Sequence, residues 1–161
     1  MLAALFAIPA AGLPSDQEQP IRISADQALR DDKQGFTKYK GNVVMDQGSL
    51  HIQADNVTVY RIVDEADKIV ARGAPAKFNQ QPDPNKDPVH AEAEIIEYYK
   101  AEDRVQLKGN ASIRQEGSTV SGDVIDYFIN EQLVKAGSDK KTRDSRVEVI
   151  IPASAVQKAG N

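Results

Sequence analysis

The sequence predicts an all-β protein, built as an open β-jellyroll or solenoid from repeated bent strand units around an apolar trough. Three observations support this prediction. Short runs rich in β-branched and aromatic residues alternate with polar residues, clusters of turn-forming residues separate these runs, and one short pattern recurs four times along the chain. No run keeps a helical period over the roughly 11 residues of an amphipathic helix, so we expect helices to contribute little to the fold.

Length and composition predict a single domain. The chain has 161 residues, 40% of them hydrophobic, and a formal net charge of -4 at pH 7. A chain of this length buries roughly two-thirds of its unfolded surface and needs no disulfide or metal to hold its core. Cysteine is absent, which excludes thiol chemistry and thiolate metal sites. The acidic balance and the few aromatic residues argue against nucleic acid as a partner.

The first segment, residues 1–12, is apolar and uncharged, and it is shorter than the ~20 residues of a membrane-spanning helix. Ala10 and Gly12 are small residues placed as in a signal-peptide cleavage site. We therefore expect a signal-peptide remnant over residues 1–12 and a single domain over residues 13–161. A buried N-terminal helix or strand is the alternative. No cysteine follows the cleavage site to carry a lipid anchor.

The recurring pattern consists of an apolar residue, a variable residue, a small residue and an acid. A glycine follows each acid after 14 (137 − 123) to 18 (73 − 55) positions. The acids are Asp26, Asp55, Glu92 and Asp123, and the glycines are Gly41, Gly73, Gly109 and Gly137. In two units the glycine opens a Gly-Asn pair, and a glutamine (Gln47, Gln115) follows that asparagine five residues later.

Segments with the composition of strands lie between segments with the composition of turns. The strand segments are residues 57–60, 95–98, 124–127 and 147–151. The turn segments are residues 31–35, 46–49, 83–88, 115–118 and 138–141. Pro82, Pro84 and Pro88 lack the backbone donors that a strand needs, so the sequence predicts a loop there.

The alternation changes phase within the predicted strands. Ile52 and Ala54 share one parity, whereas Val57 and Val59 share the other, and the same slip recurs over residues 120–127. Apolar groups stay inward across such a slip only where the strand bends or bulges. Each unit is therefore expected to turn a corner at the small residue and the acid.

The sequence contains no set of residues typical of an enzyme. His51 and His90 stand beside inward positions, so alternation points both outward, and neither a phosphate-binding loop nor a nucleophile elbow occurs. The four acids could form a line of carboxylates for glycoside cleavage. Their recurrence in every unit favours a structural role instead, in which they bond local backbone donors at the corners. We expect no catalytic residues and no metal site.

A basic cluster surrounds and follows the last glycine of the pattern. Its members are Lys135, Lys140, Lys141, Arg143 and Arg146. We interpret it as a solvated turn and strand edge. The alternative is that it attracts the anionic phosphates of a ligand or an acidic partner surface.

Five segments carry a resemblance through their order and spacing: QPIRISAD (19–26), GNVVMDQG (41–48), IQAD (52–55), GAPAKF (73–78) and LKGNA (107–111). Together they resemble the OstA-like family of periplasmic lipopolysaccharide-transport bridge proteins, from about Gln19 to Pro152. It implies a β-jellyroll whose hydrophobic groove binds the lipid A moiety of lipopolysaccharide. It also implies a carrier in the Gram-negative periplasm, between an inner-membrane extraction complex and an outer-membrane translocon, without catalytic residues or a cofactor.

An apolar trough suits such a cargo, because acyl chains in water cost ~25 cal/mol per Å² of exposed apolar surface. The expected inward wall, and so the expected lipid-binding site, consists of Ile21, Ile23, Ile52, Val57, Val59, Phe78, Ile96, Tyr98, Ile113, Val120, Ile125 and Tyr127. The resemblance singles out Ile21, Phe78 and Tyr98 as groove positions. For any single residue in this set, ordinary core packing is the alternative.

The two terminal strands, expected at residues 20–25 and 147–151, have no amphipathic helix or charged plug to cover them. Uncapped edges pair with other sheets, and pairing between unlike ends gives filaments. We therefore expect concentration-dependent head-to-tail oligomers, with homologous jellyroll domains of the inner-membrane adaptor and the outer-membrane translocon as end partners. The alternatives are a β-rich structural module without lipid cargo, a β-solenoid enzyme acting on polysaccharide, and a sister protein of the same pathway.

Overall fold

The computed structural model describes residues 15–62, 65–139 and 146–154. The expected signal-peptide remnant lies outside these residues, as do Lys140, Lys141 and Arg143 of the basic cluster. A short 3-10 helix, η1 (Asp16–Glu18), precedes ten strands. The strands are β1 (Arg22–Ser24), β2 (Gln27–Asp31), β3 (Phe36–Gln47), β4 (Leu50–Ile62), β5 (Glu65–Gln80), β6 (Val89–Tyr99), β7 (Arg104–Gln115), β8 (Ser118–Phe128), β9 (Leu133–Gly137) and β10 (Glu148–Ile150).

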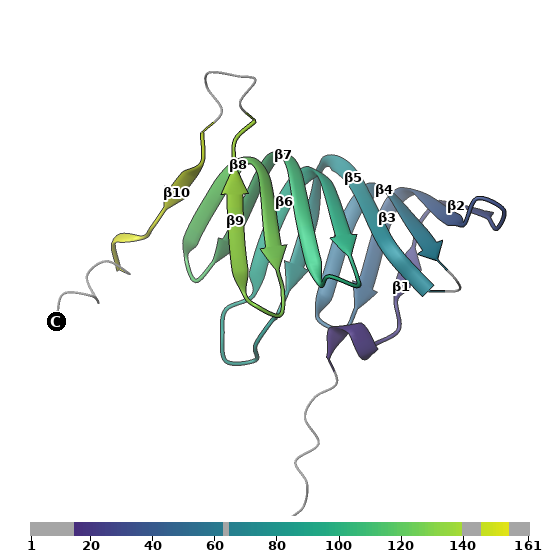
Figure 1. The fold of residues 1–161 in the computed structure, drawn as a ribbon, viewed down its shortest axis with the longest axis horizontal. Coiled ribbons are helices and arrows are strands. Elements are labelled where there is room, and N and C mark those ends of the chain that lie inside the picture. Colours follow the sequence, from purple (N-terminus) through teal and green to yellow (C-terminus); the bar gives the residue numbers. More distant parts are fainter. Residues whose placement is uncertain (1–14, 63–64, 140–145, 155–161) are drawn as a thin grey trace, which may run out of the picture.

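All ten strands belong to one antiparallel sheet, in the order β1-β3-β4-β5-β6-β7-β8-β10, with β2 also paired to β3 and β9 also paired to β8. Figure 1 shows the strands stacked one after another, with β1 and β2 at one end and β9 and β10 at the other. The two end pairs do not bond to each other, so the sheet is open. The predicted open, all-β jellyroll is confirmed.

The long strands bend near their middles. Between β3 and β8, every pair of neighbouring strands has a register shift there, for example between Lys40 and Val43 of β3 and between Lys108 and Ala111 of β7. The inward parity changes across the bend, since Ile52 and Val57 of β4 are both buried although five positions separate them. The predicted corners are confirmed.

The bends fold the sheet into two facing layers. The β2 layer contains β2, β9 and the halves of the long strands that pair beside them, such as residues 36–40 and 124–128. The β1 layer contains β1, β10 and the opposite halves, such as residues 43–47 and 118–122. The layers touch through their side chains: Phe78 of the β1 layer meets Tyr127 of the β2 layer edge to face, with ring centroids 6.4 Å apart.

Two of the bends share the same local chemistry. Gly41 and Gly109 adopt positive φ angles (82° and 77°), and the asparagine after each does so too. Asn42 Nδ2 donates to Asp26 Oδ2 over 3.3 Å, and Asn110 Nδ2 donates to a carboxylate over 2.8 Å. A side chain on either glycine would strike that same carboxylate, so only glycine fits.

Asn110 donates to Glu94. The acid at this bend is therefore Glu94, and the sequence prediction that Glu92 stands at the corner is wrong. Glu92 pairs with Ser112 inside the regular ladder, and the register shift begins only after it. With Glu94 in place, the acids form two pairs separated by 68 positions (94 − 26 and 123 − 55). Strands β3 and β7 are offset by the same 68 positions (104 − 36). The four predicted units are therefore two similar halves, in which β6 takes the place of β1 and β2.

Candidate functional site

The space between the two layers is one continuous apolar interior. All twelve residues of the predicted wall lie in it. Ile52, Val57, Val59, Phe78, Ile96, Tyr98, Ile113, Ile125 and Tyr127 are buried members of a single hydrophobic cluster, and Ile21, Ile23 and Val120 pack against it partly buried. The structure therefore places the predicted residues together on the inner faces, and their binding of lipid remains a prediction.

The interior is closed by side chains rather than by backbone. Phe78, Ile96 and Tyr98 are no more than 1% exposed because the two layers pack against each other. Each layer ends in a row of turns at the side away from the bends. The backbone hydrogen bonds run from strand to strand along the sheet, and none of the ladders joins one row of turns to the other. Separating the layers at these turns would break side-chain contacts and leave the strand pairing intact.

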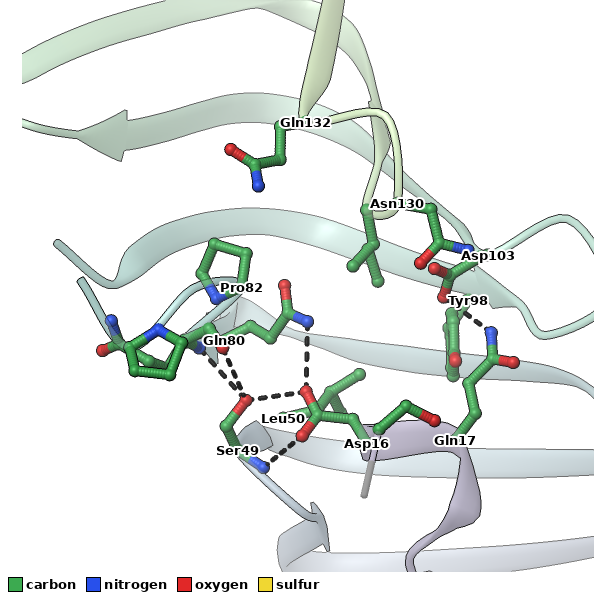
Figure 2. A pocket seen from close by; sticks show the side chains of 14 residues that line it. Asp16, Gln17, Ser49, Leu50, Gln80, Pro82, Tyr98, Asp103, Asn130 and Gln132 are labelled. Atoms are coloured by element: carbon green, nitrogen blue, oxygen red, sulfur yellow. Dashed lines mark hydrogen bonds between the residues drawn. The ribbon is translucent and has the colours of Figure 1, made fainter. Parts of the chain in front are cut away.

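We call the gap between the two rows of turns the mouth. A cavity of about 500 Å³ occupies it (Figure 2). The β1 layer contributes Ser49 and the start of the 81–88 loop, and the β2 layer contributes Asp103 and Asn130. We call the part of the interior at the bends the floor. Aliphatic residues line the floor, whereas several polar residues line the mouth at the strand ends.

A short N-terminal segment, residues 15–19, crosses the mouth, and we call it the strap. Asp16 binds the β1 layer: its carboxylate accepts from Ser49 N (2.7 Å), Ser49 Oγ (2.6 Å) and Gln80 Nε2 (3.1 Å). Gln17 binds the β2 layer, donating from Nε2 to Asp103 Oδ1 over 2.8 Å. Figure 2 shows these two side chains pointing in opposite directions from η1. The strap therefore links the two layers where no backbone ladder does.

Three buried polar residues at the mouth were missed by the sequence analysis: Gln47, Gln80 and Asp103. Glutamine on an inward strand position reads as a break in the apolar pattern, so alternation alone assigns it to the surface. The signal that could have found one of them is the Gly-Asn pair followed by Gln, which occurs twice. That spacing places Gln47 at the end of β3, directly under the strap.

Burial changes the acidity of the groups at the mouth. It raises the pKa of Tyr98 to about 12, with the nearby Asp103 carboxylate adding to the effect. The same two causes raise the pKa of Tyr127 to about 12. Burial also raises the pKa of Asp103 above its ordinary value, although the hydrogen bond from Gln17 opposes the shift. Both phenols therefore stay protonated at neutral pH.

Replacing Asp103 with asparagine is expected to flatten the pH dependence of stability. Because the pKa of Asp103 is raised in the folded state, the stability contributed by its protonated form is full below the carboxyl's unfolded pKa of about 4. It is lost as the pH rises through the folded pKa. Asparagine keeps an oxygen acceptor for Gln17 Nε2 and tolerates the positive φ of 46°. Thermal unfolding of both proteins from about pH 4 to pH 8 measures the difference.

The control for this prediction is Asp87→Asn, the same change at an exposed residue of the 81–88 loop. It should leave the pH profile of the parent protein unchanged. A variant at Asp103 that loses stability equally at every pH would mean that its carboxylate serves the strap better than an amide does, contrary to the prediction.

The outer faces of the layers carry polar pairs. His51 Nδ1 lies 2.5 Å from Asp46 Oδ1 and His90 Nδ1 lies 2.5 Å from Asn79 Oδ1, so both histidines face outward as predicted. Glu97 is more enclosed: it accepts from Tyr99 Oη over 2.7 Å and from Lys108 Nζ over 3.0 Å. Among residues 15–62, 65–139 and 146–154, no group of three or more His, Cys, Asp or Glu is arranged to hold a metal ion.

The two free ends of the sheet carry most of the large exposed apolar side chains. These are Leu29 on β2, Leu133 on β9, and Val147, Val149, Ile150 and Ile151 on or beside β10. Val149 and Ile150 are more than half exposed (53% and 56%). Exposed apolar side chains on unpaired strands are typical of surfaces that pair with another sheet. In the described part of the chain, no helix is long and apolar enough to span a membrane.

Comparisons with known proteins agree with this architecture. Residues 22–133 match the family described as "LptA/(LptD N-terminal domain) LPS transport protein". The chain is 41% identical over 138 residues to the lipopolysaccharide export system protein LptH of Pseudomonas aeruginosa, covering 85% of this chain and 79% of that protein. It is 39% identical over 156 residues to LptA of Escherichia coli K12, covering 96% and 82%.

The crystal structure of LptH from Pseudomonas aeruginosa superimposes on this fold with a TM-score of 0.81 at 37% identity, covering 86% of this chain and 99% of that one. It is described as the LptA-homologous periplasmic component of a lipopolysaccharide transport device. Sequence and structure thus lead to the same group of proteins over most of the chain's length. The chain belongs to the family of LptA/(LptD N-terminal domain) lipopolysaccharide transport proteins.

Proposed function

We propose that this protein binds lipopolysaccharide by its acyl chains between the two layers and conveys it across the periplasm. It receives its cargo from an inner-membrane extraction complex and delivers it to an outer-membrane translocon, without a catalytic step or a cofactor. We assign residues 1–12 to the end of a signal peptide and residues 13–161 to the working domain. The observation that carries the proposal is an apolar interior that continues to both free ends of an open sheet.

Physical chemistry favours lipid cargo for this interior. Acyl chains crossing water alone would expose apolar surface at ~25 cal/mol per Å², and a continuous apolar path removes this cost. The interior side chains pack against one another, so acyl chains fit only when the layers separate at the mouth. Because that separation leaves the strand pairing intact, it costs side-chain contacts that the lipid then replaces.

A photo-crosslinking experiment in cells tests the proposal. A light-activated residue at Tyr98, which faces the interior, is expected to form an adduct with lipopolysaccharide. The same residue at Glu97, on the opposite face of β6, is expected to form none. Adducts at neither position in a folded, exported protein would favour the structural module without lipid cargo. Adducts at both would indicate that the lipid contacts the outside of the sheet.

We further propose that copies of the chain join head to tail, and that the two halves of the chain define how. Strand β6 in the second half corresponds to β1 and β2 in the first half. The pairing of β5 with β6 within one chain therefore serves as the model for the pairing between the last strand of one copy and the first strands of the next. There Phe78 lies opposite Ala91. The counterpart of Ala91 is Ile23, 68 positions earlier (91 − 68).

The residue that corresponds to Phe78 in the second half is found through Ile52 of β4, the neighbour of Phe78 on the side away from β6. Phe78 pairs with Ile52, whose counterpart is Val120 (52 + 68), and Val120 pairs with Val149. The join is therefore expected to place Val149 of one copy opposite Ile23 of the next. Both side chains would then continue the apolar wall from one copy into the other. Homologous jellyroll domains of the inner-membrane adaptor and the outer-membrane translocon would pair with the ends in the same manner.

A further inference from the structure

The interior contains a small set of buried polar atoms that have no partner. Among the described residues these are Gln47 Oε1, Gln80 Oε1 and the Tyr127 hydroxyl. Each side chain is at least 96% buried, with exposures of 1%, 4% and 1%. Buried polar groups in native proteins are nearly always hydrogen-bonded, so three unpaired ones in a single interior call for an explanation beyond packing.

These atoms lie at the mouth rather than in the apolar floor. Gln47 is the last residue of β3 and Gln80 the last of β5, both in the β1 layer. Across the gap, Tyr127 and Tyr98 are the second-last residues of β8 and β6, and Asp103 follows in the turn after β6. We call these five residues the polar collar. Below it the interior is aliphatic and aromatic, so the groove changes from apolar to polar at the depth of the strand ends.

The strap shows which chemical groups fit the collar. Gln47 Nε2 donates to the backbone carbonyls of Gln17 (3.4 Å) and Gln19 (3.1 Å). Gln80 Nε2 donates to the Asp16 carboxylate, and Asp103 accepts from the Gln17 side-chain amide. The collar thus binds two carbonyl oxygens, a carboxylate oxygen and an amide N–H, and it still has two carbonyl oxygens and a hydroxyl to offer.

The same groups occur where acyl chains join the head of an acylated glucosamine. Lipid A carries its acyl chains on ester and amide linkages, which present carbonyl oxygens and N–H groups at the base of each chain. With the chains against the apolar floor, these linkages would lie at the depth of the strand ends. A ligand and the strap would then compete for the same partners.

We propose that the polar collar is the binding site for the ester and amide linkages of lipid A, and that the strap is a built-in occupant which the lipid displaces. This inference rests on the proposed function, since it places one part of the same cargo. It predicts that the collar distinguishes an acylated sugar from a plain hydrocarbon, while the floor does not.

The test compares Tyr127→Phe with Tyr60→Phe, the same change on a tyrosine that is 43% exposed. Two probes are titrated against each protein: purified lipid A, and diphenylhexatriene, a fluorescent hydrocarbon without carbonyl groups. Tyr127→Phe is expected to weaken lipid A binding about fivefold, the value of one hydrogen bond, and to leave hydrocarbon binding unchanged. It should also unfold at the same or a higher temperature, because the lost hydroxyl has no partner. Tyr60→Phe should match the parent protein with both probes.

A second variant tests the competition. The double change Asp16→Ala and Gln17→Ala removes the side chains that link the strap to the two layers, and it should bind lipid A more tightly than the parent protein. Unchanged lipid A affinity in both the Tyr127 and the strap variants would overturn the collar proposal. An equal loss of both probes in Tyr127→Phe would also overturn it, because the change would then act on the apolar floor. A parent protein that binds no lipid A would instead refute the proposed function.

Discussion

Replacing Phe78 with alanine is expected to lower the free energy of unfolding by about 3–5 kcal/mol, the usual cost of truncating a buried aromatic side chain. Phe78 is fully buried and meets the ring of Tyr127 across the two layers. Its loss removes a contact that holds the layers together at a level where no backbone ladder connects them. Because small domains are stable by only about 5–15 kcal/mol, this single change should visibly shift a urea unfolding curve.

The matched control for Phe78 is Phe128→Ala. Phe128 is a partly exposed ring at the end of β8, beneath the ammonium group of Lys135, 5.2 Å from the ring centroid. Its truncation creates no enclosed cavity and should cost far less than that of Phe78. A loss below about 1.5 kcal/mol at Phe78 would show that the interior collapses around the gap. The two layers would then be more loosely packed than their burial implies.

Cysteines at Ile23 and Val149 are expected to convert most of the protein into a covalent ladder of dimers, trimers and longer chains under oxidising conditions. The natural chain has no cysteine, so no other disulfide competes. Opposed residues of an antiparallel pair have Cα atoms about 4.5–5.5 Å apart, within the range that a disulfide spans. The two positions lie at opposite ends of the sheet, which prevents closure within one molecule.

The register is tested by moving one cysteine by a single position. Ser24 follows Ile23 on β1 but is exposed on the other face of the sheet, so the pair Ser24→Cys and Val149→Cys should form little ladder. Equal yields from the two pairs would refute the register derived from β5 and β6. A protein that stays monomeric at tens of micromolar, with or without the cysteines, would refute head-to-tail joining itself.

The fold could be predicted closely because its signals are local. Whether the apolar residues of a strand fall on odd or even positions shows which face is buried. The change between Ile52 and Val57 therefore located a bend within a few residues. The loop with Pro82, Pro84 and Pro88 was equally plain, since three missing donors exclude a central strand. The twelve predicted wall residues all lie inside for the same reason.

The mouth could not be predicted, because its contacts join residues far apart in the chain. Gln17 meets Asp103, and Asp16 meets Gln80, through pairings that no periodicity encodes. The prediction of Glu92 as the acid at this bend was wrong for a related reason: the register shift in β6 depends on the pairing with β7, which a single strand does not reveal. The local pattern predicted the bends and the apolar interior, and only the assembled sheet shows what lies between the free ends of the two layers.

The number of strands in one copy sets the length that each copy adds to the groove. The path through the sheet from β1 to β10 passes eight strand positions, and neighbouring strands lie about 4.8 Å apart, so one copy advances the groove by about 40 Å. The proposed head-to-tail bridge of identical copies would therefore grow only in steps of that size. Between two membranes at an intermediate distance, the proposed end partners or twist along the stack would have to take up the difference. The number of strands in one copy thus fixes the smallest length by which the proposed bridge can change.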